Sequence, residues 1–202
     1  MRMKRDFSQR GLGAFLVVLA LSAVSFAQSA QQSFSDVKIK NFGQMDERFY
    51  RGAQPKEEDY RSLAALGIKT VIDLRDDATT YEKPAVESLG MRYVNIPMSD
   101  KDYPREEQIQ AFLKLANDPD TGAFYVHCAG GRHRTGVMGA VYRFTKYGWN
   151  YDQVYKEMKD YDFYTRWGHG DMKKYVQDYW ERVQTTPAPV TAAAIAVAPA
   201  LK

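Results

Sequence analysis

Three short runs of β-branched and aliphatic residues most strongly limit the folds open to this chain. They are Ile68 to Leu74, Met91 to Ile96 and Ala123 to His127. Each has the length of one strand, and a nearly continuous apolar run is typical of a strand covered on both faces. Between the last two, apolar residues in Arg105 to Asn117 recur at the i, i+3, i+4 and i+7 spacing of an amphipathic helix. This alternation predicts an α/β fold with a central, largely parallel sheet.

Weaker patterns near the start of this region extend the predicted sheet. Ile39 to Phe42 and Arg48 to Arg51 resemble short strands. They would give a mostly parallel sheet of four to five strands flanked by helices. The turn before Pro55 should open a helix with acidic residues in its first turn, and Gly67 should end it.

After residue 134 the pattern is helical throughout. We expect one helix that ends at Gly148, and a second that is capped by Asp152 and runs to about Tyr161. A third should carry the apolar and aromatic residues from Met172 to Val183. These helices would cover the sheet.

The first 27 residues have the tripartite order of a secretory signal peptide. Met1 to Arg10 is basic, Leu12 to Val24 is almost wholly apolar, and Ser25-Phe26-Ala27 supplies small residues for cleavage. The apolar stretch is shorter than the roughly 20 residues that span a bilayer. We therefore expect cleavage near Ala27, with Ala30 as the alternative. The mature protein would be periplasmic or secreted and would keep no stable membrane anchor.

The rest of the chain divides into three parts by composition. Residues 28–35 form a polar leader, 36–184 one folded domain, and 185–202 a disordered tail rich in Ala, Pro and Thr. The chain holds 28 Lys and Arg against 25 Asp and Glu, but the excess lies in the first 27 residues. The remainder has no basic field for nucleic acid. We expect no nucleic-acid partner and a monomer.

Cys128 is the single cysteine. One thiol forms neither an internal disulfide nor a multi-cysteine zinc site. In an exported protein, a lone thiol is more often a reactive group than filler. It stands at the end of the third predicted core strand, and open α/β sheets bind ligands beyond the carboxyl ends of their strands.

A seven-residue turn follows that strand and leads into a helix. Its small residues let the backbone curl so that several N–H groups point at one centre, where the positive end of the helix also points. The last residue, Arg134, adds a planar fork that matches two phosphate oxygens. The sequence therefore predicts an anion cradle made of Cys128, Ala129, Gly130, Gly131, Arg132, His133 and Arg134.

The same cradle would make the thiol reactive. Inward N–H groups and nearby cations favour a thiolate, which lowers the pKa of a cysteine such as Cys128. The thiolate would attack a phosphate ester, form a cysteinyl-phosphate and then be released by water. The N–H ring and Arg134 would stabilise the charge of the transition state.

The seven residues from Cys128 to Arg134, followed by Thr135-Gly136, resemble the signature of the cysteine-dependent protein tyrosine phosphatase superfamily. The opening Asn41-Phe42 … Tyr50-Arg51-Gly52-Ala53-Gln54-Pro55 is similar to the compact dual-specificity branch, with its plant, fungal and exported bacterial members. The resemblance covers roughly Phe34 to Arg182. It implies a phosphatase P-loop between the last core strand and the following helix, no cofactor and no metal. It also implies that the partner is a phosphorylated protein or a small phosphate ester.

The resemblance also implies roles for single residues. Cys128 matches the nucleophile and Arg134 the phosphate-binding arginine. Thr135 matches the hydroxyl that hydrogen-bonds the sulfur and eases its departure. His127 matches a residue that orients the loop and helps set the acidity of the thiol.

A general acid should protonate the leaving oxygen. Relatives often place it four residues before a proline that opens the next helix, and Asp100 stands at that offset from Pro104. Asp102 is the alternative. At another strand end, Asp73 and Arg75 are expected to form an ordinary ion pair, and His169 is expected to have no role.

The substrate stays open at this level. Arg132 and His133 would add positive charge beside the pocket, and similar basic pairs occur in relatives that take inositol polyphosphates or phosphoinositides. The expected location favours phosphotyrosine on proteins, with phosphoserine and phosphothreonine also possible substrates. A rhodanese-like sulfurtransferase and an inactive phosphate-binding module are remoter alternatives. The usual rhodanese loop is one residue shorter and lacks the Arg-Thr-Gly ending.

Overall fold

A computed structural model describes residues 37–185 of the chain. The expected signal peptide at 1–27, the leader at 28–35 and the tail beyond residue 185 fall outside these residues. Every element below belongs to the unit that begins at Lys38. Among the described helices, none is both long and apolar enough to cross a membrane.

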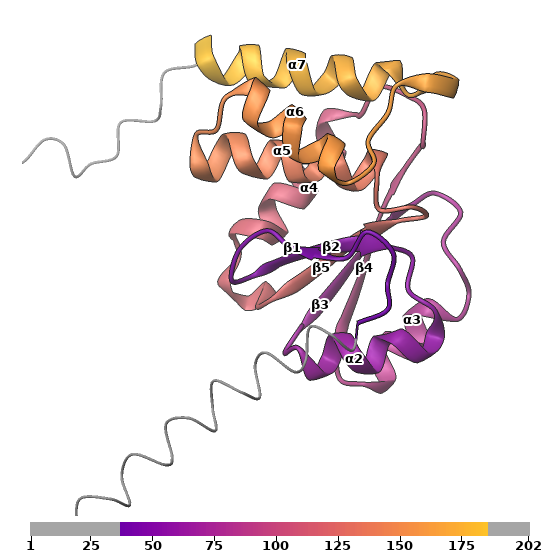
Figure 1. The fold of residues 1–202 in the computed structure, drawn as a ribbon. Coiled ribbons are helices and arrows are strands. Elements are labelled where there is room, and N and C mark those ends of the chain that lie inside the picture. Colours follow the sequence, from indigo (N-terminus) through magenta and orange to yellow (C-terminus); the bar gives the residue numbers. More distant parts are fainter. Residues whose placement is uncertain (1–36, 186–202) are drawn as a thin grey trace, which may run out of the picture. The chain divides into compact units, whose positions relative to one another are not determined.

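A five-stranded sheet forms the centre of this unit (Figure 1). The strands lie in the order β1-β2-β5-β3-β4, and only β1 and β2 are antiparallel to one another. The predicted α/β fold with a mostly parallel sheet is therefore confirmed. Their bounds are Gly43–Gln44 for β1, Phe49–Ala53 for β2, Thr70–Arg75 for β3, Arg92–Met98 for β4 and Phe124–Cys128 for β5.

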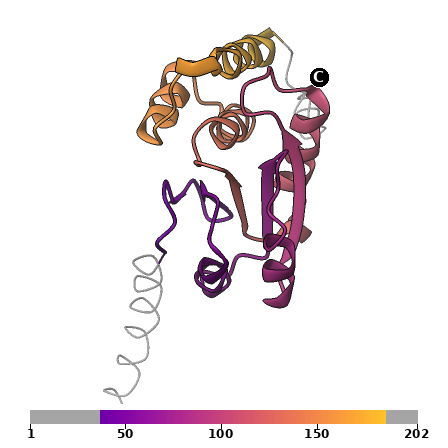
Figure 2. The same ribbon diagram turned by 90° about the vertical axis from the view of Figure 1, so that its right-hand side faces the viewer.

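Helices lie on both sides of the sheet (Figures 1 and 2). Two short ones, α2 (Tyr60–Ala65) and α3 (Glu82–Ser88), lie on one side. The other side carries α4 (Glu106–Asn117), α5 (His133–Tyr147), α6 (Tyr151–Asp160) and α7 (Gly170–Thr185). Short 3-10 turns occupy Glu57–Asp59, Pro119–Thr121 and Arg166–Gly168.

Successive side chains of β5 lie on opposite faces of the sheet, and the two faces have different surroundings. Phe124, Val126 and Cys128 are buried in the apolar core that α4 to α7 share with the sheet. Tyr125 and His127 point the other way, because successive side chains of a strand face opposite sides. The nucleophile candidate and its neighbour His127 therefore stand in different environments.

Three elements differ from the sequence expectation. Ile39 to Phe42 is a turn instead of a strand, and Asn41 takes a left-handed conformation there with φ 53°. Helix α6 begins two residues earlier than expected, because Asn150 caps it by accepting a hydrogen bond from the Gln153 N–H. Helix α3 was not expected, since it is short and contains Pro84; a proline is tolerated in the first turn, where its N–H has no helical partner.

Candidate active site

The loop after β5 has its carbonyl groups turned outward. Three successive carbonyl oxygens accept hydrogen bonds from donors outside the loop. With the oxygens held outward, the intervening N–H groups face the concave side, as an anion cradle requires. The donors are Gln54 N to Ala129 O at 3.3 Å, Asn41 Nδ2 to Gly130 O at 2.8 Å, and Arg51 Nη2 to Gly131 O at 2.8 Å.

Gly131 fits this curl because it has no side chain. Its φ is 67°, in the left-handed region that L side chains rarely adopt. A Cβ on Gly131 would lie 2.4 Å from the backbone carbon of Gly52. The loop and the end of β2 are thus in direct backbone contact, and only glycine allows it.

The Cys128 side chain lies at the bottom of the cradle and is 3% exposed. Burial by itself raises the pKa of its thiol. The Thr135 hydroxyl and backbone N–H, the Arg134 guanidinium and the Arg132 N–H oppose burial, and together they hold the pKa of Cys128 below its ordinary value. The Thr135 hydroxyl makes no other hydrogen bond in the described part of the chain, so it is available to the sulfur.

Arg134 is buried, and two hydrogen bonds hold its guanidinium in place. Its Nη1 donates to Asp76 Oδ1 at 3.0 Å and to the Met98 carbonyl at 2.9 Å. The guanidinium lines the same cavity as Cys128. Two fixed partners on one nitrogen orient the planar group and leave its remaining N–H groups for an anion.

A second buried arginine stands behind the loop. Arg51 is 1% exposed, and its guanidinium lies 3.9 Å from the centre of the Tyr161 ring. Burial lowers the pKa of Arg51, whereas Tyr161, Glu157 and Cys128 raise it. Its positive charge therefore supports a thiolate in addition to holding the Gly131 carbonyl.

The two candidate acids lie in different cavities. Asp100 lines the cavity of about 160 Å³ that contains Cys128 and Arg134. Asp102 lines a neighbouring cavity of about 350 Å³, on the side of Tyr103 and Gln108. The structure thus brings Asp100, and not Asp102, to the cavity of the thiol.

His133 and His169 form a stacked pair at the rim of this cavity. Their ring centroids are 3.6 Å apart, at an interplanar angle of 11°. Burial, together with His169 and Arg132, lowers the pKa of His133 to about 4. His133 is therefore neutral at pH 7 and does not carry the positive charge expected from the sequence. His169, expected to have no role, donates its Nδ1–H to the Asp100 carbonyl at 2.7 Å and so holds the loop that bears Asp100.

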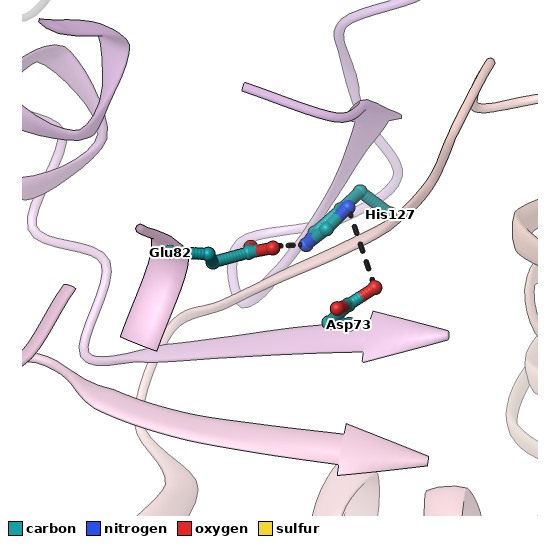
Figure 3. A group of neighbouring side chains, drawn as sticks. All are labelled: Asp73, Glu82 and His127. Carbon is teal, nitrogen blue, oxygen red and sulfur yellow. Dashed lines mark ion pairs between the residues drawn. The ribbon is translucent and has the colours of Figure 1, made fainter. Parts of the chain in front are cut away.

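His127 does not enter the cavity. Its Nε2 lies 2.6 Å from Glu82 Oε1, and its Nδ1 lies 3.9 Å from Asp73 Oδ1 (Figure 3). These three side chains could hold a metal ion by composition. The direct contact between the ring and Glu82 instead uses the nitrogen and the oxygen that a metal would need. Asp73 does not form the expected ion pair with Arg75, whose guanidinium binds Asp77.

Several residues of the site were not found from the sequence. Asn41, Arg51 and Gln54 lie in the opening that carried the family resemblance, but nothing in the sequence showed that they hold the loop. Asp76 follows the β3 strand end, a place where ligand-binding residues gather. Glu82 gave one signal, because an acidic residue two positions before Pro84 is typical of a helix start.

An α/β sheet with a buried, acidified thiol under a ring of inward N–H groups, closed by a fixed arginine, defines a cysteine-dependent phosphatase. Residues 21–174 match the family described as "DSP-PTPase phosphatase fused to NAD+ Kinase". The chain belongs to this family, and it is a protein-tyrosine or dual-specificity phosphatase.

Curated relatives agree with this assignment. "Probable tyrosine-protein phosphatase DG1060" of Dictyostelium discoideum is 30% identical over 125 residues, which cover 59% of this chain and 74% of that protein. "Dual specificity protein phosphatase TpbA" of Pseudomonas aeruginosa is 28% identical over 164 residues, which cover 79% of this chain and 70% of that protein.

Solved structures share the fold at lower identity. Tk-PTP in its active form has a TM-score of 0.60 at 20% identity and covers 70% of this chain and 97% of its own. The catalytic core of the PP-IP phosphatase SIW14 from S. cerevisiae has a TM-score of 0.60 at 19% identity, with 70% and 86% covered. A Cys-to-Ser variant of TpbA in complex with pTyr has a TM-score of 0.56 at 21% identity, with 72% and 91% covered.

Proposed function

We propose that this protein is an exported phosphatase that removes phosphate from phosphotyrosine in proteins through a cysteinyl-phosphate. The observation that carries the proposal is the outward tethering of three loop carbonyls above a thiol of lowered pKa. Phosphotyrosine is favoured by the TpbA variant that was solved with pTyr.

In the first step, the Cys128 thiolate attacks phosphorus in line with the leaving oxygen. A sulfur–phosphorus bond forms and the phosphorus–oxygen bond of the ester breaks. Asp100 gives its proton to the departing phenolate. The loop N–H groups and Arg134 hold the three equatorial oxygens, where the charge of the transition state lies.

In the second step, water releases the phosphate. Asp100, now a carboxylate, takes a proton from the attacking water, and the sulfur–phosphorus bond breaks to return the thiolate. Thr135 donates to the leaving sulfur, and a sulfur of lowered pKa leaves more easily. The residues carry both steps without a metal, so a chelator should not inhibit.

The decisive experiment combines turnover with binding. Cys128→Ser should abolish hydrolysis of p-nitrophenyl phosphate and still bind tungstate or vanadate, since the N–H ring and Arg134 remain. Equal turnover in that variant would disprove the covalent route. Loss of oxyanion binding in a folded Cys128→Ser protein would disprove the cradle.

A second substrate class, the inositol polyphosphates, has an observation in its favour. A groove of about 550 Å³ adjoins the catalytic cavity and shares Arg132 and Tyr164 with it. Lys159 also lines the groove, opposite Asp162, which pairs with Arg132 at 3.6 Å. A second anionic group of a substrate would find two cations there. SIW14, which shares the fold, is named a PP-IP phosphatase.

A substrate panel separates the two classes. We expect kcat/KM for phosphotyrosine peptides to exceed that for phosphoserine and phosphothreonine peptides and for inositol polyphosphates. Lys159→Gln should then leave phosphotyrosine turnover within about twofold. Preferred hydrolysis of an inositol polyphosphate that Lys159→Gln weakens at least fivefold would replace our assignment with the second class.

Export is supported by the order of basic, apolar and small residues in the first 27 positions. N-terminal sequencing of the protein recovered from its native host should begin near Gln28, or near Gln31 if cleavage follows Ala30. An intact Met1 in the mature protein would contradict export by cleavage.

A further inference from the structure

Three titratable side chains are fully buried on the face of the sheet opposite Cys128. Asp73 of β3, Glu82 of α3 and His127 of β5 are each 0% exposed and converge on one another (Figure 3). None of them lines the cavity that contains the thiol. Burying such groups costs free energy unless they are paired. The two-step reaction above gives the two carboxyl groups no task.

The pKa values of the two carboxyl groups are shifted in opposite directions. Burial raises the pKa of both, but in Glu82 the contacts of His127, Gln54 and Tyr60 outweigh burial and hold the pKa below its ordinary value. In Asp73 burial prevails and the pKa is raised. The surroundings of Glu82 therefore favour its carboxylate form, whereas those of Asp73 disfavour the carboxylate form.

The Glu82 carboxylate contacts His127 directly and is linked to Ala129 through Gln54. Its Oε1 lies 2.6 Å from Nε2 of His127, the residue directly before Cys128. Its Oε2 accepts a hydrogen bond from Gln54 Nε2 at 2.8 Å. The backbone N–H of the same Gln54 donates to the carbonyl of Ala129, the residue directly after Cys128. The Glu82 carboxylate thus connects His127, which precedes Cys128, with Gln54, whose backbone N–H holds the carbonyl that follows Cys128.

We propose that Glu82 is a positioning residue for Cys128. By holding His127 and Gln54 together, its carboxylate keeps the start of the loop in the conformation in which the N–H groups face the sulfur and the phosphate. The inference rests on the proposed thiolate chemistry, but it is tested through thiol acidity and anion binding, which do not require turnover.

A positioning role predicts that Glu82→Gln raises the pKa of Cys128, whereas the direct electrostatic effect of losing the charge would lower it. Removing a negative charge near a thiol favours the thiolate and lowers its pKa. Loosening the loop has the reverse effect, because the N–H groups of Arg132 and Thr135 then stabilise the thiolate less well. The thiol interacts with Arg134 and Thr135 of α5 and, electrostatically, with Arg51 of β2 and Tyr125 of β5. Those that face the cluster are Tyr60 of α2, Arg75 of β3, Tyr93 of β4 and Gln54 after β2.

The test compares Glu82→Gln with Glu87→Gln, an exposed glutamate of the same helix that pairs with Lys83. Because Cys128 is the single cysteine, the pH dependence of alkylation by iodoacetamide reports its pKa directly. We expect Glu82→Gln to raise the pKa of Cys128 by about one unit and to weaken vanadate binding about tenfold. Glu87→Gln should change neither. Asp73→Asn should change both less than Glu82→Gln does, since Asp73 Oδ1 lies 3.9 Å from the His127 ring nitrogen, whereas Glu82 Oε1 lies 2.6 Å from its own.

An unchanged or lowered pKa of Cys128 in folded Glu82→Gln would overturn the proposal. If that variant does not fold, Gln54→Met takes its place, because it removes one of the two links and keeps the contact between Glu82 and His127. We expect a smaller rise in the thiol pKa with Gln54→Met, and an unchanged value would overturn the proposal as well. A raised thiol pKa in these variants together with a wild-type protein that hydrolyses no phosphate ester would instead refute the proposed function alone.

Discussion

Two neighbouring glycines of the loop look alike in sequence and differ in the structure. Gly131 has a positive φ and touches the backbone of Gly52. Gly130 has no positive φ, and a Cβ there would meet only the Arg132 side chain, at an ordinary 3.5 Å. The curl of the cradle therefore depends on one glycine, whereas the other only supplies a small residue.

Gly131→Ala and Gly130→Ala form a matched pair that tests this difference. Gly131→Ala should lower the free energy of unfolding by roughly 2 kcal/mol or more, because it combines backbone strain with a backbone clash. It should also weaken vanadate binding at least tenfold. Gly130→Ala should stay within about 0.5 kcal/mol and bind as wild type. Urea unfolding and vanadate titration check both variants, and equal effects would contradict the assignment.

The position of Asp100 in the thiol cavity gives a second prediction at this scale. Asp100→Asn should lower kcat for phenyl phosphate by about 10² or more, since the leaving phenolate then lacks a proton donor. Asp102→Asn, in the neighbouring cavity, should keep kcat within about threefold. A tenfold loss in Asp102→Asn with little change in Asp100→Asn would reverse the assignment.

Among the elements, the stacked pair of His133 and His169 joins segments of the site that are distant in sequence. His133 begins α5 directly after the loop, and His169 precedes α7 and holds the Asp100 carbonyl. One pair of rings therefore connects the anion cradle to the segment that bears the acid.

The pH dependence of stability should report this stack. The pKa of His133 is about 4 in the folded protein against 6.5 for the free group, so the unfolded chain binds more protons between these values. The free energy of unfolding should fall as the pH drops from about 6.5 to 4, with up to about 3 kcal/mol from this residue. Urea unfolding of wild type and His133→Gln at pH 7.5, 5.5 and 4.5 measures the difference. A difference that does not change over this range would rule the effect out.

Strong periodic patterns predicted most elements, and local chemistry explains the exceptions. β3, β4 and β5 were predicted from continuous apolar runs, and the helix α4 from its spacing of apolar residues. Helix α3 was missed because seven residues with a proline carry almost no periodic signal. Asn41 was assigned to a strand, but its left-handed backbone places its amide on the Gly130 carbonyl, a tertiary contact that local propensity does not contain.

The residues that form the anion cradle could be predicted from the sequence, whereas the residues that hold the cradle in place could not. The cradle residues form one continuous segment, so their residue types predicted an anion site, and the family resemblance pointed to Asp100 as the acid. Glu82, Asp76 and Gln54 act through contacts that exist only after folding. Burial reversed one expectation, since it removed the charge expected on His133.

For the whole molecule, the site draws on β2, β5, α5 and the segment after β4, so its occupancy should stabilise the entire fold. A ligand at 100 times its Kd adds about 2.7 kcal/mol to the free energy of unfolding when only the folded state binds it. We expect this gain for wild type with vanadate and for Cys128→Ser with tungstate. Arg134→Ala should show no gain at the same concentrations. Urea unfolding with and without the oxyanion measures it, and an equal gain in Arg134→Ala would mean that the ion binds elsewhere.

The hydrogen bonds that hold the loop carbonyls join residues far apart in sequence, as far as 89 positions for Asn41 and Gly130. Grafting the heptapeptide from Cys128 to Arg134 onto a foreign strand–helix scaffold would transfer the thiol and the guanidinium. It would not transfer the donors that hold the loop carbonyls in place. Such a graft should capture phosphate only if the scaffold also supplies three donors in the places of Asn41, Arg51 and Gln54.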